Sequence, residues 1–245
     1  MLHRLSAVLS PAEALPRAAA ALVVDVIRAT TTAAYLLAAG ARELVLTAEV
    51  TQARAEARRR GALLAGERGG LPPEGFDLGN SPREADPERL RGRAVVMTTT
   101  NGTRAALRAA GAARRVGLAA LVNVRAALRW AAAGEGDLVL VAAGREGRAA
   151  LDDTYAVGAL ADALSAFAPQ AELDDTAQLA RALFRAHPEA RALLAQTAAA
   201  RALEPVGLAD DVEACARLDA LDVVPVLAER LDNALRFVPV YPKGV

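Results

Sequence analysis

The chain has little of several residue types, and each shortage excludes a class of protein. Cys215 is the only cysteine among 245 residues, so no intramolecular disulfide can form and nothing indicates an oxidising compartment. No apolar run is long enough to cross a bilayer, and the N-terminus lacks the basic segment and apolar core of a signal peptide. These absences predict a cytoplasmic protein that has no membrane partner.

Net charge and aromatic content are also low. The 29 acidic and 29 basic residues cancel, and aromatic residues make up only 3% of the chain, so no nucleic-acid partner is expected. His3, His187 and the isolated Cys215 do not provide a zinc ligand set. The sole lysine, Lys243, lies in the C-terminal tail, which excludes a Walker phosphate loop, and no GxGxxG motif follows a strand.

Apolar residues are abundant, at 53% of the chain, and their pattern predicts the fold class. Continuous apolar runs, typical of strands buried in a parallel sheet, alternate with alanine-rich helical segments, which predicts a three-layer α/β/α fold. The expected strands lie at residues 20–27, 43–47, 62–65, 94–97, 115–119, 137–143, 223–227 and 237–241. The expected helices lie at residues 31–39, 50–60, 104–110, 124–133, 151–167, 176–186, 188–202 and 210–218. No linker is evident, and we place a boundary near residue 145, between units at 1–145 and 146–245.

The stretch TTTNGT at residues 98–103 separates an apolar run from an alanine-rich helical segment. The first backbone N–H groups of a helix have no partner within it, and its dipole favours an anion there. Threonine hydroxyls add donors, and Gly102 allows the backbone to approach a ligand closely. An ordinary threonine or asparagine helix cap explains the same residues, so this stretch alone leaves both interpretations open.

A second stretch of the chain is built in the same way. An ungapped offset of 71 residues aligns Thr32 with Thr103 and Gly40 with Gly111, together with several alanine, leucine and valine pairs. Alanine richness alone produces some of these matches, so the repeat is weak. It predicts two similar strand-loop-helix units, each with threonines at the start of its helix.

Regular periodicity disappears over residues 66–87, which contain GERGG and GFDLGNSP. A span of this length without regular structure is more often a functional loop than a simple connection. A mobile surface excursion is the alternative, although Phe76 and Leu78 are candidates to anchor the loop. We therefore expect the loop to contribute to a site.

Acidic residues occur at predicted strand ends and in glycine-rich loops, where sheet proteins place ligands. These residues are Asp25, Glu67, Asp77, Asp152 and Asp153. Each one alone is more often a helix cap or the partner of an arginine. Several carboxylates beside two anion-binding loops favour a hard cation such as Mg²⁺, which uses one or two carboxylates together with waters and phosphate oxygens.

Five blocks in this order resemble the ComB family, the 2-phosphosulfolactate phosphatases. The blocks are DVIRATTT at 25–32, GERGG at 66–70, GFDLGNSP at 75–82, TTTNGT at 98–103, and AG at 143–144 followed by DDT at 152–154. The resemblance implies an α/β/α fold of two similar, intertwined units. It also implies a Mg²⁺-dependent phosphatase that converts 2-phospho-3-sulfolactate, a small-molecule partner, to 3-sulfolactate and phosphate in coenzyme M biosynthesis. The chain departs from the family at Asp152, where a glutamate is expected.

Each candidate residue has a predicted role. Asp25, Glu67 and Asp153 are predicted to hold Mg²⁺ directly or through water, with Asp152 and Asp77 as further candidates. The phosphoryl group is expected beside Thr99, Thr100, Asn101, Gly102 and Thr103, with Arg28 and Arg104 neutralising its oxygens and Arg68 or Arg145 binding the sulfonate. A non-catalytic protein that binds a phosphorylated metabolite is the alternative. The sequence leaves a monomer and a homo-oligomer equally open.

Overall fold

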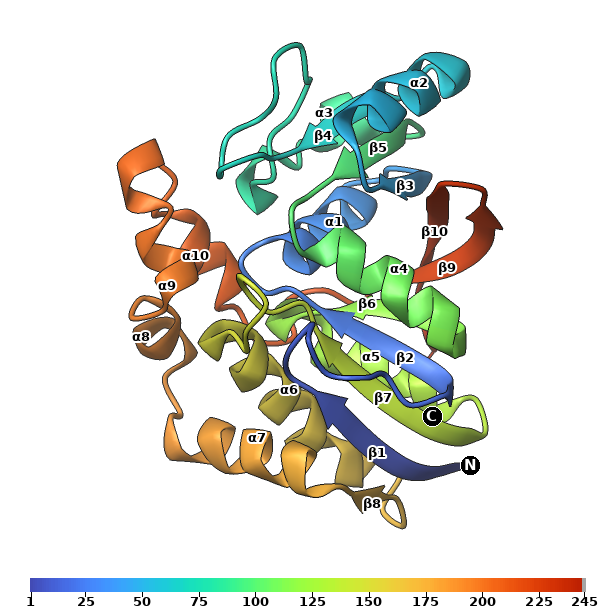
Figure 1. The fold of residues 1–245 in the computed structure, drawn as a ribbon, viewed down its shortest axis with the longest axis vertical. Helices are drawn as coiled ribbons and strands as arrows, with labels where there is room; N and C mark the ends of the chain where they lie inside the picture. The colour runs from blue at the N-terminus through green and yellow to red at the C-terminus, as the bar shows by residue number, and fades with distance from the viewer. Residues whose placement is uncertain (244–245) are drawn as a thin grey trace.

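A ten-stranded sheet organises the protein, whose computed structural model describes residues 1–243 (Figure 1). The strands are β1 (Leu2–Val8), β2 (Ala18–Val24), β3 (Glu43–Thr47), β4 (Leu63–Gly66), β5 (Ala94–Thr98), β6 (Ala113–Ala119), β7 (Gly136–Ala142), β8 (Glu172–Leu173), β9 (Val224–Leu231) and β10 (Ala234–Val240). The α-helices are α1 (Ala29–Ala38), α2 (Val50–Arg60), α3 (Pro87–Leu90), α4 (Gly102–Ala112), α5 (Val124–Ala132), α6 (Leu151–Ala163), α7 (Asp175–Ala186), α8 (Ala190–Leu194), α9 (Ala198–Arg201) and α10 (Asp211–Cys215).

The strand order shows how the two repeats are combined. The order is β4-β5-β3-β10-β9-β6-β2-β7-β1-β8. The first repeat runs β2-α1-β3-α2-β4 along the chain, and the second runs β5-α4-β6-α5-β7. In the sheet, β5 pairs in parallel with β4 and β3, while β2 pairs in parallel with β7 and β6. Each three-stranded parallel group therefore takes its central strand from the other repeat, which confirms two similar, intertwined units.

Helices cover both faces of the sheet, as expected for an α/β/α fold. Side chains alternate along β2, so that Leu22 and Val24 pack in one core with α5 and α6, whereas Ala21 and Val23 pack in another core with α1 and α4. In β3, Val45 packs in a third, smaller core with α2. The crossover helices α1 and α4 thus lie over one face, and α2, α5 and α6 cover the other.

The last two strands join the two parallel groups. Strand β9 pairs antiparallel with β10 and β6, and β10 pairs antiparallel with β3. Strands from both sides of residue 145 therefore belong to one sheet, and the boundary near that residue stays a prediction. Within residues 1–243, no helix is long and apolar enough to span a membrane.

Several parts of the chain differ from the expected elements, and β8 and α3, like β1, were not expected. Residues 2–8 were not expected as a strand, yet β1 pairs in parallel with β7 and β8. One helix was predicted for residues 188–202, but α8 and α9 are separate short helices. The Thr197 side chain accepts a hydrogen bond from the Ala200 N–H at 3.1 Å and so begins α9 as a new helix. The prediction of helical structure was correct for most of residues 188–202, but a capping residue divided the segment into two helices.

Candidate active site

The turn between β2 and α1 places Asp25 at the centre of the site. Strand β2 ends at Val24, so Asp25 is the first residue beyond it, and its side chain is buried. One carboxylate oxygen, Oδ1, accepts the Ala29 N–H at 3.1 Å at the beginning of α1. The Ile27–Arg28 peptide in this turn is cis. Asp25 therefore occupies the positive end of α1, where a negative charge is favoured.

In the TTTNGT stretch, some threonines cap the helix and others are placed to contact a ligand. The Thr99 hydroxyl accepts the Thr103 N–H at 3.1 Å, and the Thr103 hydroxyl accepts the Thr99 N–H at 3.1 Å. These two buried residues stabilise the start of α4 and were predicted to contact phosphate. The hydroxyls of Thr99 and Thr103 are already paired. Thr100 and Asn101, which follow Thr99, are therefore the better candidates for ligand contact.

The two helix starts meet at Gly102. A Cβ atom at this position would lie 2.7 Å from Asp25 Oδ2 and 2.5 Å from the Cβ of Ala29. The Gly102 N–H also acts to lower the pKa of Asp25. The Asp25 carboxylate thus lies against the starts of both α1 and α4, and only glycine allows this approach. The two threonine-bearing turns therefore meet at Gly102.

The GERGG loop brings Glu67 to the same place. Gly66, with a φ of +138°, passes so close to β5 that a Cβ atom would lie 2.0 Å from the Thr98 carbonyl oxygen. Glu67 then accepts the N–H of Thr100 at 2.7 Å and the N–H of Gly70 at 3.1 Å. The long loop is thereby fixed to the start of α4, as expected of a functional loop.

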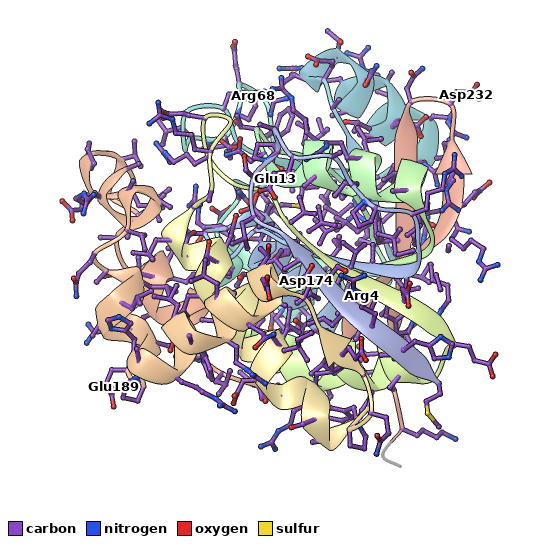
Figure 2. The ribbon with its side chains drawn as sticks, turned by 60° about the horizontal axis from the view of Figure 1, so that its bottom comes forward. Arg4, Glu13, Arg68, Asp174, Glu189 and Asp232 are labelled. Atoms are coloured by element: carbon purple, nitrogen blue, oxygen red, sulfur yellow. The ribbon has the colours of Figure 1, made fainter. Side chains whose placement is uncertain are left out.

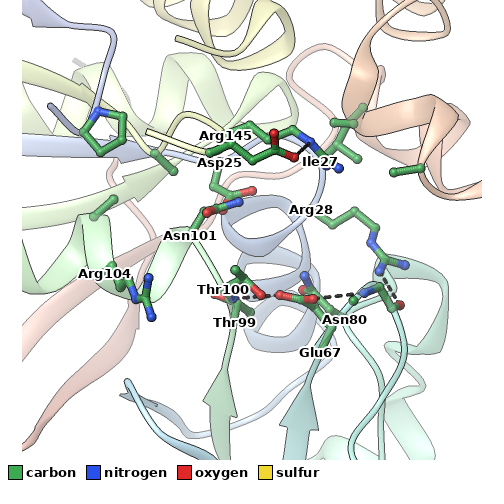
Figure 3. Close-up of a pocket in the computed structure, with 18 of the residues that line it drawn as sticks. Asp25, Ile27, Arg28, Glu67, Asn80, Thr99, Thr100, Asn101, Arg104 and Arg145 are labelled. Atoms are coloured by element: carbon green, nitrogen blue, oxygen red, sulfur yellow. Dashed lines mark hydrogen bonds and ion pairs between the residues drawn. The ribbon is translucent and has the colours of Figure 1, made fainter. Parts of the chain in front are cut away.

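A cavity of about 670 Å³ opens between these elements (Figure 3). Its volume is in the range typical of small-molecule sites. In Figure 3, Asn101 lies next to Asp25, with Arg145 above them, Arg104 to the left and Glu67 below. Ala199 and Leu203 of the C-terminal helical segment add an apolar wall. The cavity therefore contains both carboxylates and cationic side chains, as a phosphate ester and a cation require.

The acids around Asp25 raise each other's affinity for protons. The pKa of Asp25 is raised to about 7, mainly by burial and also by the nearby carboxylates of Asp152 and Glu67, while the N–H groups of Ala29 and Gly102 act to lower it. Burial also raises the pKa of Asp152 to about 6, against hydrogen bonds from backbone N–H groups. The site concentrates negative charge that a cation would offset.

Asp153 has a different environment from Asp152. Its Oδ1 accepts the Val26 N–H and its Oδ2 accepts the Gly144 N–H, both at 2.9 Å, so it joins the ends of β2 and β7. Burial and the charges of Asp152 and Asp25 raise its pKa well above the ordinary value. Both oxygens of Asp153 are therefore held by backbone N–H groups, as both oxygens of Glu67 are, and a metal ion bound at either residue would share its oxygen with such a donor.

The donor atoms fit a hard cation that is held partly by substrate and water. Within residues 1–243, no three His, Cys, Asp or Glu side chains cluster closely enough to hold a metal ion by themselves. Mg²⁺ commonly uses only one or two protein carboxylates. Asn80 lines the same cavity as Asp25 and Glu67, and its buried Oδ1 has no hydrogen-bond partner in the described chain. An unpartnered buried oxygen is costly unless a ligand satisfies it.

Arg28 is held by protein atoms rather than left free for a phosphate. Its Nη1 lies 2.6 Å from Asp211 Oδ2, with both side chains buried, and its Nη2 donates to the Gly70 carbonyl at 2.9 Å. Ser81 donates its hydroxyl to the other Asp211 oxygen at 2.6 Å. Although Arg28 borders the cavity, these contacts give it a positioning role that links α1, the GERGG loop and α10.

Six predicted site residues do not line the cavity, namely Arg68, Asp77, Gly102, Thr103, Asp152 and Asp153. The first two are held elsewhere by other parts of the chain. Arg68 donates to the carbonyls of Glu67 and Ala48 and to the Thr98 hydroxyl, so it fixes the loop and does not face a sulfonate. Asp77 is exposed, and its carboxylate accepts the Leu64 N–H at 2.8 Å. A metal role for Asp77 has no support in this geometry, because the residue organises the chain around β4.

Sequence reasoning missed two residues of the site. Asn80 lies in the GFDLGNSP block, which was quoted without a role, so its position in that block was an available signal. Asp211 lies in a helical region far along the chain, and no local pattern connects it with Arg28. Only the tertiary structure brings this pair together.

Comparison with known proteins agrees with the geometry. The family model described as 2-phosphosulpholactate phosphatase matches residues 6–230. A Thermus thermophilus protein named "Probable 2-phosphosulfolactate phosphatase" is 48% identical over 228 residues, covering 93% of this chain and 95% of that protein. A Deinococcus radiodurans protein of the same name is 46% identical over 224 residues, covering 89% and 92%. A Caldanaerobacter subterraneus protein, again of that name, is 36% identical over 210 residues, covering 84% and 86%.

Proposed function

The chain belongs to the 2-phosphosulfolactate phosphatase family, and from this premise we propose that it is a phosphoric monoester hydrolase with Mg²⁺ as its cofactor. Its substrate would be 2-phospho-3-sulfolactate or a related phosphorylated hydroxy acid, and its products the free hydroxy acid and phosphate. The pathway that this substrate would serve is coenzyme M biosynthesis. A cytoplasmic location stays a prediction from the sequence.

The observation that carries the proposal is the convergence at Asp25. One buried carboxylate joins the starts of both crossover helices, and Glu67 and Asn101 line the same cavity. A purely structural cap would not need a second acid, a cationic side chain and an open volume beside it. This combination is suited to an anionic ester together with a cation.

The start of α4 would bind the phosphoryl group. Thr100 and Asn101 offer polar side chains there, and Arg104 follows on the next turn with its side chain lining the cavity. The positive end of the helix and the guanidinium would stabilise charge on the phosphoryl oxygens. Thr99, Gly102 and Thr103 hold this segment in place through the contacts described above.

Asp25 and Glu67, with Asn80 of the same cavity and the nearby Asp152, would hold the Mg²⁺ ion directly or through water. When bound, the ion would neutralise phosphate charge and lower the pKa of a water molecule. Hydrolysis would form a bond between a water oxygen and phosphorus and break the bond to the ester oxygen, and the proton lost by the water would match the proton gained by the leaving alkoxide. Ala199 and Leu203 would limit access of bulk water to this reaction.

Phosphate release tests the proposal. We expect wild-type protein to release phosphate from 2-phospho-3-sulfolactate with Mg²⁺ and to lose this activity when the ion is chelated. Asp25→Asn should lower turnover at least tenfold and about a hundredfold if the lost stabilisation is about 3 kcal/mol. The matched control is Asp232→Asn, because Asp232 is exposed in the turn between β9 and β10, away from the cavity (Figure 2).

Each contrary result removes a defined part of the proposal. Unchanged turnover in Asp25→Asn would show that Asp25 has no role in the mechanism. Full activity in the presence of chelator would show that the reaction needs no Mg²⁺ ion. Thermal stabilisation by the phosphate ester without any phosphate release would favour the non-catalytic binding protein.

A further inference from the structure

Arg108 is a cationic residue of the cavity that has no role so far. It lies four residues after Arg104 in α4, and both side chains line the cavity. The Arg108 Nη2 atom donates to the Glu13 carbonyl oxygen at 2.6 Å. Its Nη1 atom is buried and lacks a hydrogen-bond partner within residues 1–243. No carboxylate of that part of the chain forms an ion pair with Arg108.

A turn near the N-terminus holds Arg108 in this position. The Ser10 N–H donates to Glu13 Oε1 at 2.9 Å, and the Ser10 hydroxyl donates to the Gly147 carbonyl at 2.9 Å. Pro11, within the same turn, lines the cavity. The turn therefore bridges Arg108 and the segment that contains Arg145, and it fixes one nitrogen of the guanidinium while the other has no partner within residues 1–243.

A guanidinium with a buried and unpartnered nitrogen is stabilised by an anion. Leaving a buried donor unpaired costs free energy, and an arginine without an acidic partner suits a planar oxyanion such as carboxylate, or a sulfonate. Residues four apart on a helix lie on the same face, separated by a rise of about 6 Å. Arg108 is thus one turn farther than Arg104 from the start of α4, beyond the place assigned to the phosphoryl group.

We propose that Arg108 binds the second anionic group of the substrate and so selects phosphorylated hydroxy acids that carry a carboxylate or sulfonate besides the phosphate. This inference rests on the proposed phosphatase activity. It assigns the predicted sulfonate contact to a residue of α4 that the sequence did not single out, in place of Arg68. Arg145, which also lines the cavity, forms an ion pair with Glu146 at 3.5 Å.

Four substrates with one carbon framework test this assignment. Isopropyl phosphate carries only the phosphate, 2-phospholactate adds a carboxylate, 1-sulfo-2-propyl phosphate adds a sulfonate, and 2-phospho-3-sulfolactate carries both. The measured quantity is kcat/KM for each charged substrate divided by kcat/KM for isopropyl phosphate. We expect Arg108→Gln to lower this ratio about tenfold to a hundredfold for the anion that Arg108 contacts. The substrate with the larger loss distinguishes sulfonate from carboxylate, and equal losses indicate a subsite that accepts both.

Controls separate binding from folding. Arg58→Gln, at an exposed position of α2 outside the cavity, should leave every ratio unchanged. Arg108→Lys should restore part of the ratio, because it keeps the charge but loses the fork of donors. A uniform loss on all four substrates, or no loss on any, would overturn the assignment.

A binding measurement distinguishes failure of this inference from failure of the proposed function. Calorimetric titration with 3-sulfolactate, which carries no ester, requires no turnover. Weaker binding by Arg108→Gln, compared with wild type and Arg58→Gln, would support the subsite even if no phosphate were released. Equal binding by all three proteins would contradict the subsite whatever the catalytic result.

Discussion

The two helix starts are built from similar sequences but do different work. At α1, residues 30–32 are all buried threonines, and their hydroxyls donate to the backbone carbonyls of Ala119, Val26 and Asn80 at 2.7 to 3.0 Å. At α4, Thr99 and Thr103 pair with each other, whereas Thr100 and Asn101, which line the cavity together with Thr99, do not take part in that pair. The threonine hydroxyls of the first turn all bond to backbone carbonyls, whereas the second turn has polar groups that can contact a ligand.

The difference shows how a repeated unit can serve a single site. The first turn supplies the acid, Asp25, together with a closed network that holds it. The second turn supplies donors and a cation for an anionic group. Because each three-stranded group takes its middle strand from the other repeat, the two turns are brought to the same place, and neither half alone contains the complete site.

The largest predicted effect is on the free energy of unfolding, and it distinguishes Arg28 at the first turn from Arg104 at the second. Arg28→Gln should reduce the free energy of unfolding by about 3–5 kcal/mol, because it leaves the buried Asp211 carboxylate without its partner. Arg104→Gln removes an exposed side chain and should change the free energy of unfolding by less than about 0.5 kcal/mol, while turnover falls at least tenfold. Urea unfolding and phosphate release measure both. Equal destabilisation by the two substitutions would contradict the distinction between the turns.

The second prediction concerns pH. The pKa of Asp25 is raised to about 7 in the folded protein, so the folded state holds its proton more tightly than the unfolded chain. Its contribution to stability is therefore fully present below about pH 4, the ordinary aspartate range, and is lost as pH rises to about 7. Asn cannot titrate, so Asp25→Asn should gain stability relative to wild type across this window, on the order of a few kcal/mol.

Urea unfolding in chelator at several pH values measures this difference. Asp232→Asn, at an exposed position, should show no comparable change with pH. Added Mg²⁺ should shrink the difference between wild type and Asp25→Asn near pH 7, because a bound cation would offset the same charge. A difference that does not vary between pH 4 and pH 7 would contradict the raised pKa.

The smallest predicted effect on stability is at the contact between the turns. Gly102→Ala would place a Cβ atom against Asp25 and Ala29, and we expect it to cost about 1–3 kcal/mol. Gly111→Ala is the matched control in the same helix, since its Cβ would meet nothing within 4 Å. It should be neutral or stabilise by up to about 1 kcal/mol. Thermal unfolding compares the two, and equal melting temperatures would show that the turns do not meet tightly.

Local sequence patterns predicted much of the fold, and their failures have identifiable causes. Helix α2 was predicted with the bounds that the structure has, because the arginine-rich segment ends at Gly61, which adopts the left-handed conformation. Strand β1 was missed because its buried and exposed residues do not alternate regularly. The helix expected at 188–202 was divided by the cap at Thr197, whose effect depends on a side-chain geometry that helix propensity does not contain.

The candidate site was predicted in outline but not in the role of each residue. Asp25, Glu67, Asn101 and Arg104 were all expected beside one ligand, and all line one cavity. Arg28, Arg68 and Asp77 had the right chemistry, but internal partners occupy them. Residue type shows which groups are able to bind an ion or a phosphate. It does not show which of them the folded protein has already satisfied.

The sequence by itself determined the alternating strand and helix pattern, the paired threonine turns and the set of acids and arginines, because these depend on periodicity, capping and residue chemistry along short stretches. Only the tertiary structure decided that β2 and β5 exchange places between the two parallel groups, that Asp25 lies against both helix starts, and that Arg28 is paired while one donor of Arg108 has no partner within residues 1–243. Those outcomes depend on contacts between residues far apart in the chain, such as Leu63 with Val95 and Arg28 with Asp211, where burial and hydrogen-bond partners are set by packing rather than by neighbours in the sequence.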